Sequence, residues 1–466
     1  MSHEPLAALP VHRLSRLIQQ REVSPVELVD SCLDSIARRE PRLQAFVAVH
    51  ADEARLAAQG AEAAIRAGHS VGPLHGIPIA LKDLIEIEGQ VFTGGSEAWK
   101  DRRATRTATL ARKLVAQGVI VLGKTHTVEF AMGGWGTNTL RGTPWNPWDP
   151  QVKRTPGGSS NGSAVAVAGR LVPWAVGTDT GGSIRMPASW CGITGLKTST
   201  GRISTHGIQP LSTTLDTPGP MARCVEDVAL LYAAMQGADP LDPLTAGLAY
   251  VDPLPTLQAG IRGLRLARMP ESERRYASAE VLAAYDESLR ALQSLGAEIV
   301  TLELPFRFED VAAFNLRIMA AESYALHHAL IDDPAAPLDP DVRPRIAAGR
   351  DISARAYLEA VQQRSVMKQQ FAQAMQGIDA LLTPSTMTTA LPLTEVDQTK
   401  APAHYTRFGN YLDLCGLSLP NGFDSQGLPT SLQIICRSQQ EDLALRIGWA
   451  YEQASAWNAQ LPPGLE

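Results

Sequence analysis

Short apolar runs alternate with helix-like segments along most of the chain. The runs at 77–82, 119–124 and 172–178 are short and bounded by turn residues, which is typical of buried strands. Residues 108–117 and 225–236 instead carry apolar positions at helical spacing. This alternation predicts an α/β fold around a sheet, without giving the order of its strands.

Two helices are expected before the first strand. Ser24 can accept a hydrogen bond from the amide of Glu27, and Glu27 can reach back, as in a capping box. Pro25 suits a first helical position, so a helix over 25–39 is expected. The alanine-rich run at 51–67 predicts a second helix. Both should form an outer layer.

In the second half of the chain, predicted strands and helices alternate again after a connecting segment. Residues 237–260 hold many prolines and have weak periodicity, which indicates a surface connection. Beyond it we expect helices near 278–294, 308–330 and 353–375, strands near 264–269, 297–302 and 379–383, and a final helix near 441–453.

Composition narrows the class of protein. The 466 residues are 44% hydrophobic and 19% charged, as in a globular enzyme with an ample core. A net charge of −6 argues against nucleic acid as a partner. Since there is neither an apolar run of membrane-spanning length nor a basic-then-apolar N-terminus, we expect a cytoplasmic protein that does not bind membranes.

The cysteines and histidines do not form a recognisable metal pattern. The five cysteines are scattered without a CxxC pair, and none of the ten histidines lies in an HExxH pattern. We therefore expect no metal and no cofactor. Cys191 lies near the segment considered next, but a small apolar packing role is favoured over a nucleophilic one.

Two glycine-rich turns within residues 156–187 carry serines that are candidate catalytic residues. Glycine has no Cβ, so such turns can bring backbone amides close to a reacting centre. Ser159 and Ser183 stand 24 residues apart in these turns. Upstream, Lys82 ends an apolar run, where loss of hydration would lower its pKa and leave a neutral base. These residues suggest a Ser-Ser-Lys constellation.

The segments that carry these three residues resemble the amidase signature family of serine hydrolases. They read PLHGIPIALKD at 73–83, GGSS at 157–160 and TDTGGSIR at 178–185, in the family's order and spacing. The later GLKTSTGRIS and LDTPGPMARCVEDVALL segments, and the GLSLPNGFDSQGLPTSLQIICR segment near the end, match as well. Asn161 and Leu84 depart from the usual pattern, without removing a catalytic group.

The resemblance implies a fold and a division of the chain. It implies an α/β/α sandwich around a mixed sheet of about eleven strands, formed by one amidase domain over residues 1–466. Within that domain we expect an N-terminal helical layer (1–70), a catalytic signature core (71–236), a diverged substrate-side region (237–400) and a return to the core (401–466).

The resemblance also implies the site residues. Ser183 would attack the carbonyl carbon, while Ser159 would pass the proton to Lys82. The peptide bond at the middle serine is cis in the family. The resemblance implies oxyanion-holding amides at Thr180, Gly181, Gly182 and Ser183, with support from an Asp179–Arg185 ion pair and from Ser160.

Substrate identity is less constrained by the motifs. Met132, Gly133, Gly134 and Trp135 resemble the segment that lines the acyl site, with Trp135 as an aromatic wall. An apolar or aryl amide is the favoured small-molecule substrate, and a carbamate is plausible. The alternative is a glutamine-hydrolysing protein similar to the amidase subunit of glutamyl-tRNA amidotransferase, which needs partners. A homodimer is also left open.

The chain also contains two other motif matches. Residues 118–125 satisfy the GxxxxGK[ST] formula of a phosphate-binding loop. However, the backbone amides of the intervening VIVL run should form hydrogen bonds within a sheet, which leaves them unable to bind phosphate. Residues 158–162 fit GxSxG with Ser160 as nucleophile, yet no strand precedes them. We expect Ser160 to form hydrogen bonds within its own turn.

Overall fold

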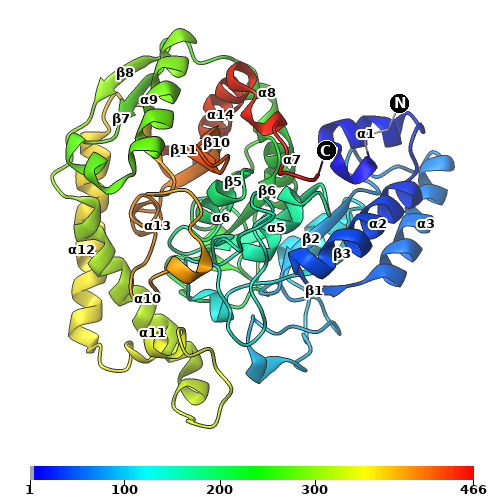
Figure 1. The fold of residues 1–466 in the computed structure, drawn as a ribbon, viewed down its shortest axis with the longest axis horizontal. Coiled ribbons are helices and arrows are strands. Elements are labelled where there is room, and N and C mark those ends of the chain that lie inside the picture. Colours follow the sequence, from blue (N-terminus) through cyan, green and yellow to red (C-terminus); the bar gives the residue numbers. More distant parts are fainter. Residues whose placement is uncertain (1–4, 466) are drawn as a thin grey trace.

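All eleven strands of the structure belong to a single mixed sheet, as expected (Figure 1). The computed structural model describes residues 5–465. In chain order the strands are β1 (Phe46–Val49), β2 (Pro78–Lys82), β3 (Ile120–Thr125), β4 (Trp174–Asp179), β5 (Thr194–Lys197), β6 (Thr217–Ala222), β7 (Arg265–Arg268), β8 (Glu298–Thr301), β9 (Ala380–Pro384), β10 (Cys415–Phe423) and β11 (Pro429–Cys436). Their order across the sheet is β1-β3-β2-β4-β6-β5-β10-β11-β9-β7-β8.

All eight expected α-helices are present, and residues 5–465 hold six more that were not expected. In chain order the α-helices are α1 (Val11–Gln19), α2 (Pro25–Leu43), α3 (Ala51–Arg66), α4 (Thr109–Ala116), α5 (Asn161–Ala168), α6 (Arg185–Trp190), α7 (Val225–Met235), α8 (Leu254–Leu257), α9 (Ala279–Ser294), α10 (Phe308–Ile331), α11 (Arg343–Ala347), α12 (Ala354–Ala374), α13 (Arg407–Tyr411) and α14 (Glu441–Ser455). Strand β1 lies between α2 and α3, which were both expected before the first strand. The helices expected in the second half lie within one or two residues of α9, α10, α12 and α14.

The capping box that predicts α2 is present. Ser24 Oγ accepts from the Glu27 amide at 3.1 Å, and the Glu27 carboxylate accepts from the Ser24 amide at 2.8 Å. The helix runs past the expected end at residue 39 as far as Leu43, with Pro41 inside it. Proline so near a helix end breaks little of the hydrogen-bond ladder, so the helix continues.

Two strands in the middle of the sheet bring the catalytic motifs together. β2 and β4 are parallel neighbours, with Ala80 opposite Ala175 and Leu81 opposite Val176. Because parallel strands end at the same edge of a sheet, Lys82 at the end of β2 lies beside the end of β4. The turn that follows β4 carries Ser183.

Helices cover both faces of this sheet. Neighbouring residues of a strand point to opposite faces. In β10, Gly416 packs against Arg185 of α6, whereas Leu417 packs against Gly448 of α14. Helices α6 and α14 therefore lie on opposite faces, which confirms the expected α/β/α sandwich. In Figure 1, α2 and α3 form one flank and α10 and α12 the other.

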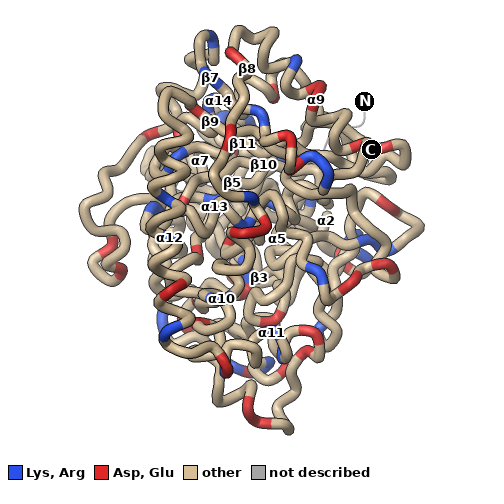
Figure 2. Tube along the Cα trace, turned by 90° about the vertical axis from the view of Figure 1, so that its left-hand side faces the viewer, with Lys and Arg blue, Asp and Glu red and all other residues tan. Residues whose placement is uncertain are grey.

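Charged residues are distributed over the whole fold. Figure 2 shows Lys and Arg interspersed with Asp and Glu along the chain, without a basic face in that view. None of the helices within residues 5–465 combines the length and apolar character needed to cross a membrane.

Candidate active site

The amine of Lys82 is surrounded by three hydroxyl groups. Its Nζ lies 2.7 Å from Ser159 Oγ, 3.0 Å from Ser160 Oγ and 2.8 Å from Thr178 Oγ1. The Lys82 side chain is fully buried. A neutral amine has two hydrogens to donate and one lone pair to accept with. It can therefore satisfy three hydroxyls and take a proton from one of them.

The buried position sets the basicity of Lys82. Loss of hydration lowers its pKa from 10.5 to about 7, and the charges of Asp179 and Asp216 oppose this shift. Near neutral pH a substantial share of Lys82 is therefore unprotonated. A group with such a pKa can both accept and return a proton under these conditions.

The turn before α5 holds Ser159 against Lys82. The peptide bond between Gly158 and Ser159 is cis, as the resemblance implied. Gly158 has no room for a side chain, since a Cβ there would lie 2.6 Å from the carbonyl oxygen of Gly133. Glycine at this position allows the serine turn to pack against residues 133–136.

Ser183 lies on the turn between β4 and α6. Its carbonyl oxygen accepts a hydrogen bond of 3.2 Å from the Ser160 amide, which joins the two serine turns. The Ser183 hydroxyl makes no hydrogen bond with any residue between 5 and 465, and Ser183 lines a cavity. The hydroxyl is therefore free to turn toward Ser159 or toward a ligand.

The expected ion pair between Asp179 and Arg185 is present and completely buried. Two hydrogen bonds of 3.0 Å join the guanidinium to the two carboxylate oxygens. Burial alone would raise the pKa of Asp179, but the charge and hydrogen bonds of Arg185 hold it well below its usual range. The pair therefore anchors the turn that carries Ser183.

Two partners of this ion pair could not be found from the sequence motifs. Arg185 also donates to Asn410 Oδ1 at 2.6 Å and to Gln433 Oε1 at 2.8 Å. Asn410 in turn donates to Asp179. These residues follow Arg185 by more than 200 positions, and only the strand order places them beside it.

One of the four candidate oxyanion amides is already engaged. The Gly182 amide donates to Asp179 Oδ1 at 2.7 Å. The amides of Thr180, Gly181 and Ser183 have no acceptor among residues 5–465. Three amides are therefore available to an external oxygen, and Asp179 fixes the position of the fourth.

We expect Gly182→Ala to lower kcat/KM by at least about tenfold, and Gly181→Ala to have a much smaller effect. Gly182 has φ of +130°, and its Cβ would lie 2.7 Å from Thr406 Cβ, so the turn must move. A Cβ at Gly181 meets its nearest neighbour, Arg407 Nε, at 3.7 Å. Steady-state kinetics of the two variants, with circular dichroism as a folding control, tests this difference. Equal losses would contradict it.

Ser183 opens into a largely apolar cavity of about 580 Å³. The four residues expected to bind substrate, Met132, Gly133, Gly134 and Trp135, all line it, as do Thr180 and Gly181. Its remaining wall includes Met186, Leu211, Leu316, Met319 and Ile352. A small ligand with an apolar body fits such a lining.

Trp135 lines the cavity, whereas Trp145, Trp148 and Trp190 do not. The Trp135 ring stacks on Trp190 at 5.4 Å, and its Nε1 donates to the Lys400 carbonyl at 2.7 Å. Trp148 packs on Phe423 instead. Trp135 is therefore held rigidly by its neighbours.

Ser160 corrects one expectation from the sequence. Its hydroxyl donates to the carbonyl of Thr178 and accepts from Lys82, rather than bonding within its own turn. The cause is close packing of the turn on β4, where a Cβ at Gly177 would lie 2.8 Å from Ser160 Oγ. Ser160 thus helps to hold Lys82.

The phosphate-loop match and Cys191 both belong to the packed interior. Most of the GxxxxGK[ST] segment forms β3, whose residues pair with both β1 and β2, and Lys124 is buried and donates to the carbonyl of Ile85. Those amides are not arranged as a phosphate-binding loop. Cys191 is fully buried, and burial raises the pKa of its thiol, which does not suit a nucleophile.

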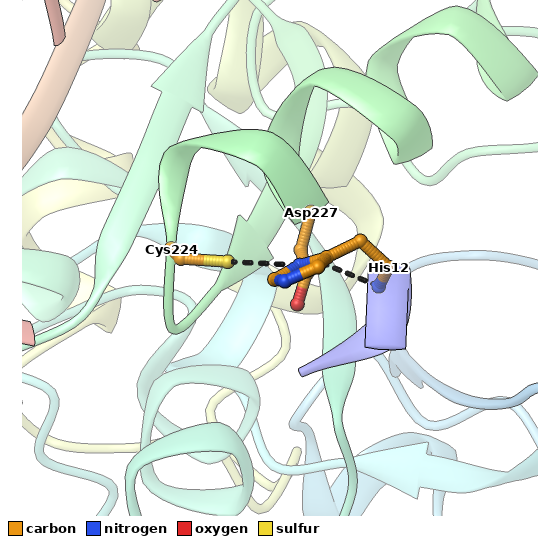
Figure 3. A group of neighbouring side chains, drawn as sticks. All are labelled: His12, Cys224 and Asp227. Carbon is orange, nitrogen blue, oxygen red and sulfur yellow. Dashed lines mark hydrogen bonds and ion pairs between the residues drawn. The ribbon is translucent and has the colours of Figure 1, made fainter. Parts of the chain in front are cut away.

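A group of potential metal ligands lies at the junction of α1 and α7 (Figure 3). His12 Nδ1 lies 2.8 Å from Asp227 Oδ1 and 3.9 Å from Cys224 Sγ. The Asp227 carboxylate also accepts from the amides of Val11 and His12. These bonds attach the start of α1 to α7. No sequence motif marks the group, because His12 and Cys224 are 212 residues apart.

We expect His12→Gln to lower the free energy of unfolding by about 1–3 kcal/mol at pH 6, through loss of a charge-assisted hydrogen bond. The bond to Asp227 raises the pKa of His12 above 6.5. Its contribution is therefore complete below pH 6.5 and disappears as the pH rises through the folded-state pKa. Urea unfolding of both proteins from pH 5 to 9 measures this. A pH-independent difference would contradict the proposed ion pair.

Known proteins of similar sequence and structure identify the family. The amidase family model matches residues 27–445. An amidase of Pseudomonas putida is 38% identical, with 98% of each chain covered, and a glutamyl-tRNA(Gln) amidotransferase subunit of Halorhodospira halophila (strain DSM 244 / SL1) is 36% identical, over 98% of this chain and 99% of that one. A solved structure described as a vestigial protein complex that reveals the evolutionary origins of an s-triazine catabolic enzyme aligns with a TM-score of 0.90 at 30% identity, over 96% of this chain and 98% of that one. This chain therefore belongs to the amidase signature family, whose chemistry is the hydrolysis of carbon–nitrogen amide bonds.

Proposed function

We propose that this enzyme hydrolyses a small-molecule amide through an acyl-enzyme on Ser183. The observation that carries the proposal is the contact of 2.7 Å between Ser159 Oγ and the buried amine of Lys82. A lysine with a pKa of about 7 can act as the base that a serine nucleophile requires.

The reaction proceeds in two halves through the same groups. Ser183 Oγ attacks the carbonyl carbon, and its proton passes through Ser159 to neutral Lys82. The protonated Lys82 then returns a proton through Ser159 to the departing nitrogen, so that an amine leaves and an ester to Ser183 remains. Water attacks this ester by the same relay, releasing the acid and restoring Ser183.

Backbone amides stabilise the oxyanion in this proposal. Thr180, Gly181 and Ser183 have amides without an acceptor among residues 5–465, and all three residues line the cavity. Gly182 was expected to contribute as well, but its amide is bonded to Asp179. We propose that Gly182 shapes the turn while the other three amides hold the oxygen. The ion pair of Asp179 and Arg185 supports this turn.

The cavity supports an amide with an apolar or aryl portion as the substrate. Met132 and Trp135 form part of a wall in which apolar side chains predominate. A carbamate presents the same carbonyl group to Ser183, and its cleavage would release carbon dioxide together with an amine. No cofactor takes part in the proposed steps.

The relatives also support a second candidate function. The similarity to a glutamyl-tRNA(Gln) amidotransferase subunit raises a glutamine-hydrolysing role within a complex. Purified protein should be assayed alone for amine or ammonia release from aryl amides, aliphatic amides, aryl carbamates and glutamine. Turnover of amides without partners would support the free-standing enzyme, whereas inactivity on the whole panel would favour the role within a complex.

We further propose that the chain functions as one amidase domain, since strands between residues 46 and 436 share one sheet. The five cysteines are all free, which supports a reducing compartment such as the cytoplasm. A homodimer stays a prediction, which size-exclusion chromatography with light scattering would test.

A further inference from the structure

Arg407 is a cation without a partner among residues 5–465, and it lies in the wall of the active-site cavity. It is the first residue of α13 and lies beside the oxyanion turn, where its Nε is 3.7 Å from the position of a Cβ on Gly181. The Nε atom is buried and has no hydrogen-bond acceptor. None of the guanidinium nitrogens forms a hydrogen bond or ion pair with the described part of the chain.

Arg185 is a second arginine near the site, and its buried guanidinium, unlike that of Arg407, has hydrogen-bond partners within residues 5–465. That side chain is fully buried, and Asp179, Asn410, Gln433 and the Thr406 carbonyl satisfy it. Arg407 is partly buried, its Nε has no such group in the described part of the chain, and burial lowers its pKa to about 10. A cation in that position needs an anion that the described chain does not supply.

The charges around the cavity have one sign. Arg317, Arg345, Lys400 and Arg407 line it, and no aspartate or glutamate within residues 5–465 does. Arg345 is engaged by the carbonyl of Met132 and by Gln398, and Lys400 lies 3.2 Å from Asp397. Arg317 lies over the Phe314 ring at 5.9 Å, and the side chains nearest to a Cβ on Gly181 are those of Arg407 and Asn315. Arg407 is therefore the unengaged cation next to the oxyanion turn.

A second unpartnered polar side chain lies close to the same point. Asn315 of α10 is fully buried, and both its oxygen and its nitrogen lack a hydrogen-bond partner within residues 5–465. Asn315 Oδ1 lies 4.0 Å from the Cβ position on Gly181, near which Arg407 Nε also lies. Helices α10 and α13, which carry the two residues, contact each other. Two polar side chains without a partner within residues 5–465 therefore lie beside the oxyanion turn.

We propose that Arg407 binds a carboxylate carried by the substrate, so that the enzyme acts on amides that also contain a free acid. This inference rests on the proposed function of Ser183. The two terminal nitrogens of a guanidinium can bind both oxygens of a carboxylate in one plane. The apolar cavity then holds the part of the substrate between the acid and the scissile amide.

Matched substrates test this specificity. Succinanilic acid and glutaranilic acid place the acid on the acyl side, and N-acetyl-4-aminobenzoate places it on the leaving group. Each is compared with its methyl ester in the wild-type protein and in Arg407→Gln, Arg407→Lys and Arg355→Gln. Arg355 is an exposed arginine of α12, paired with Glu359, and serves as the control for loss of one charge.

The wild-type enzyme should prefer the acid to its ester in at least one pair. Arg407→Gln should lower kcat/KM for that acid by about 10- to 100-fold while changing the ester by less than about threefold. Arg407→Lys should recover part of the loss, and Arg355→Gln should retain the wild-type ratio. An ester preferred in every pair, or equal losses for acid and ester in Arg407→Gln, would overturn the proposal.

A binding measurement separates this inference from the reaction itself. Ser183→Ala protein is titrated with glutaranilic acid by calorimetry, with and without Arg407→Gln. Binding that the second substitution abolishes supports the carboxylate site, even if no amide is hydrolysed by the native protein. Unchanged binding in the double variant overturns it. Arg407→Gln should also melt no lower than the native protein, because it removes an unpaired cation.

Discussion

Replacement of Ser183 by alanine is expected to reduce amide hydrolysis by at least about 10⁴-fold, whatever the substrate. The hydroxyl is the only part of the side chain removed, and it forms no hydrogen bond within residues 5–465. The substitution therefore removes the attacking oxygen without breaking a contact of the fold. We expect an unchanged melting temperature together with lost activity.

Mass spectrometry makes the Ser183 test decisive. The native protein should gain the mass of the acyl group when mixed with a slowly hydrolysed carbamate, and Ser183→Ala should not. Ser294→Ala, which alters an exposed serine whose hydroxyl bonds only within α9, is the matched control and should acylate normally. An adduct that persists in Ser183→Ala would reject Ser183 as the nucleophile.

The second large effect is expected for Lys82→Met. Methionine preserves most of the alkyl chain but cannot take the proton from Ser159, so kcat/KM should fall by about 10³-fold or more. In the native enzyme, kcat/KM should decline about tenfold per pH unit below pH 7, because the pKa of Lys82 is about 7 and only the neutral amine acts as base. The residual activity of Lys82→Met should lack this decline.

Lys82 is needed for activity but lowers the stability of the folded protein at neutral pH. Burial lowers the Lys82 pKa below its unfolded value of 10.5, so between pH 7 and 10.5 the unfolded chain binds the extra proton. Stability therefore rises with pH across that window, and Lys82 destabilises the fold most at pH 7 and below. Lys82→Met should be at least as stable as the native protein at pH 7.

Lys124 supplies a matched control for Lys82. It is also buried, on the neighbouring strand β3, and burial lowers its pKa to about 8, but it contacts the carbonyl of Ile85 rather than a serine. Lys124→Met should keep the decline of activity below pH 7 even if it is less stable. If kcat/KM of Lys82→Met still declined about tenfold per pH unit below pH 7, another group would be the base.

Local features of the chain determined much of the fold. The α2 cap depends on Ser24 and Glu27, three residues apart, and the placement of Lys82 at a strand end depends on the apolar run before it. The pair of Asp179 and Arg185 is likewise local, and so are the segments around Lys82, Ser159 and Ser183 that resemble those of the family. Such features are set by neighbours along the chain, so a sequence reveals them.

The tertiary structure alone decided which distant groups meet. Thr178 as a third hydroxyl on Lys82, Asn410 beside Arg185, and the unpaired Arg407 beside Gly181 all depend on which strands and helices become neighbours. Periodicity and propensity describe each element separately and do not encode the order β2-β4-β6-β5-β10 that brings these residues together. That order follows from burying all the elements in one core, and so it appears only in the folded chain.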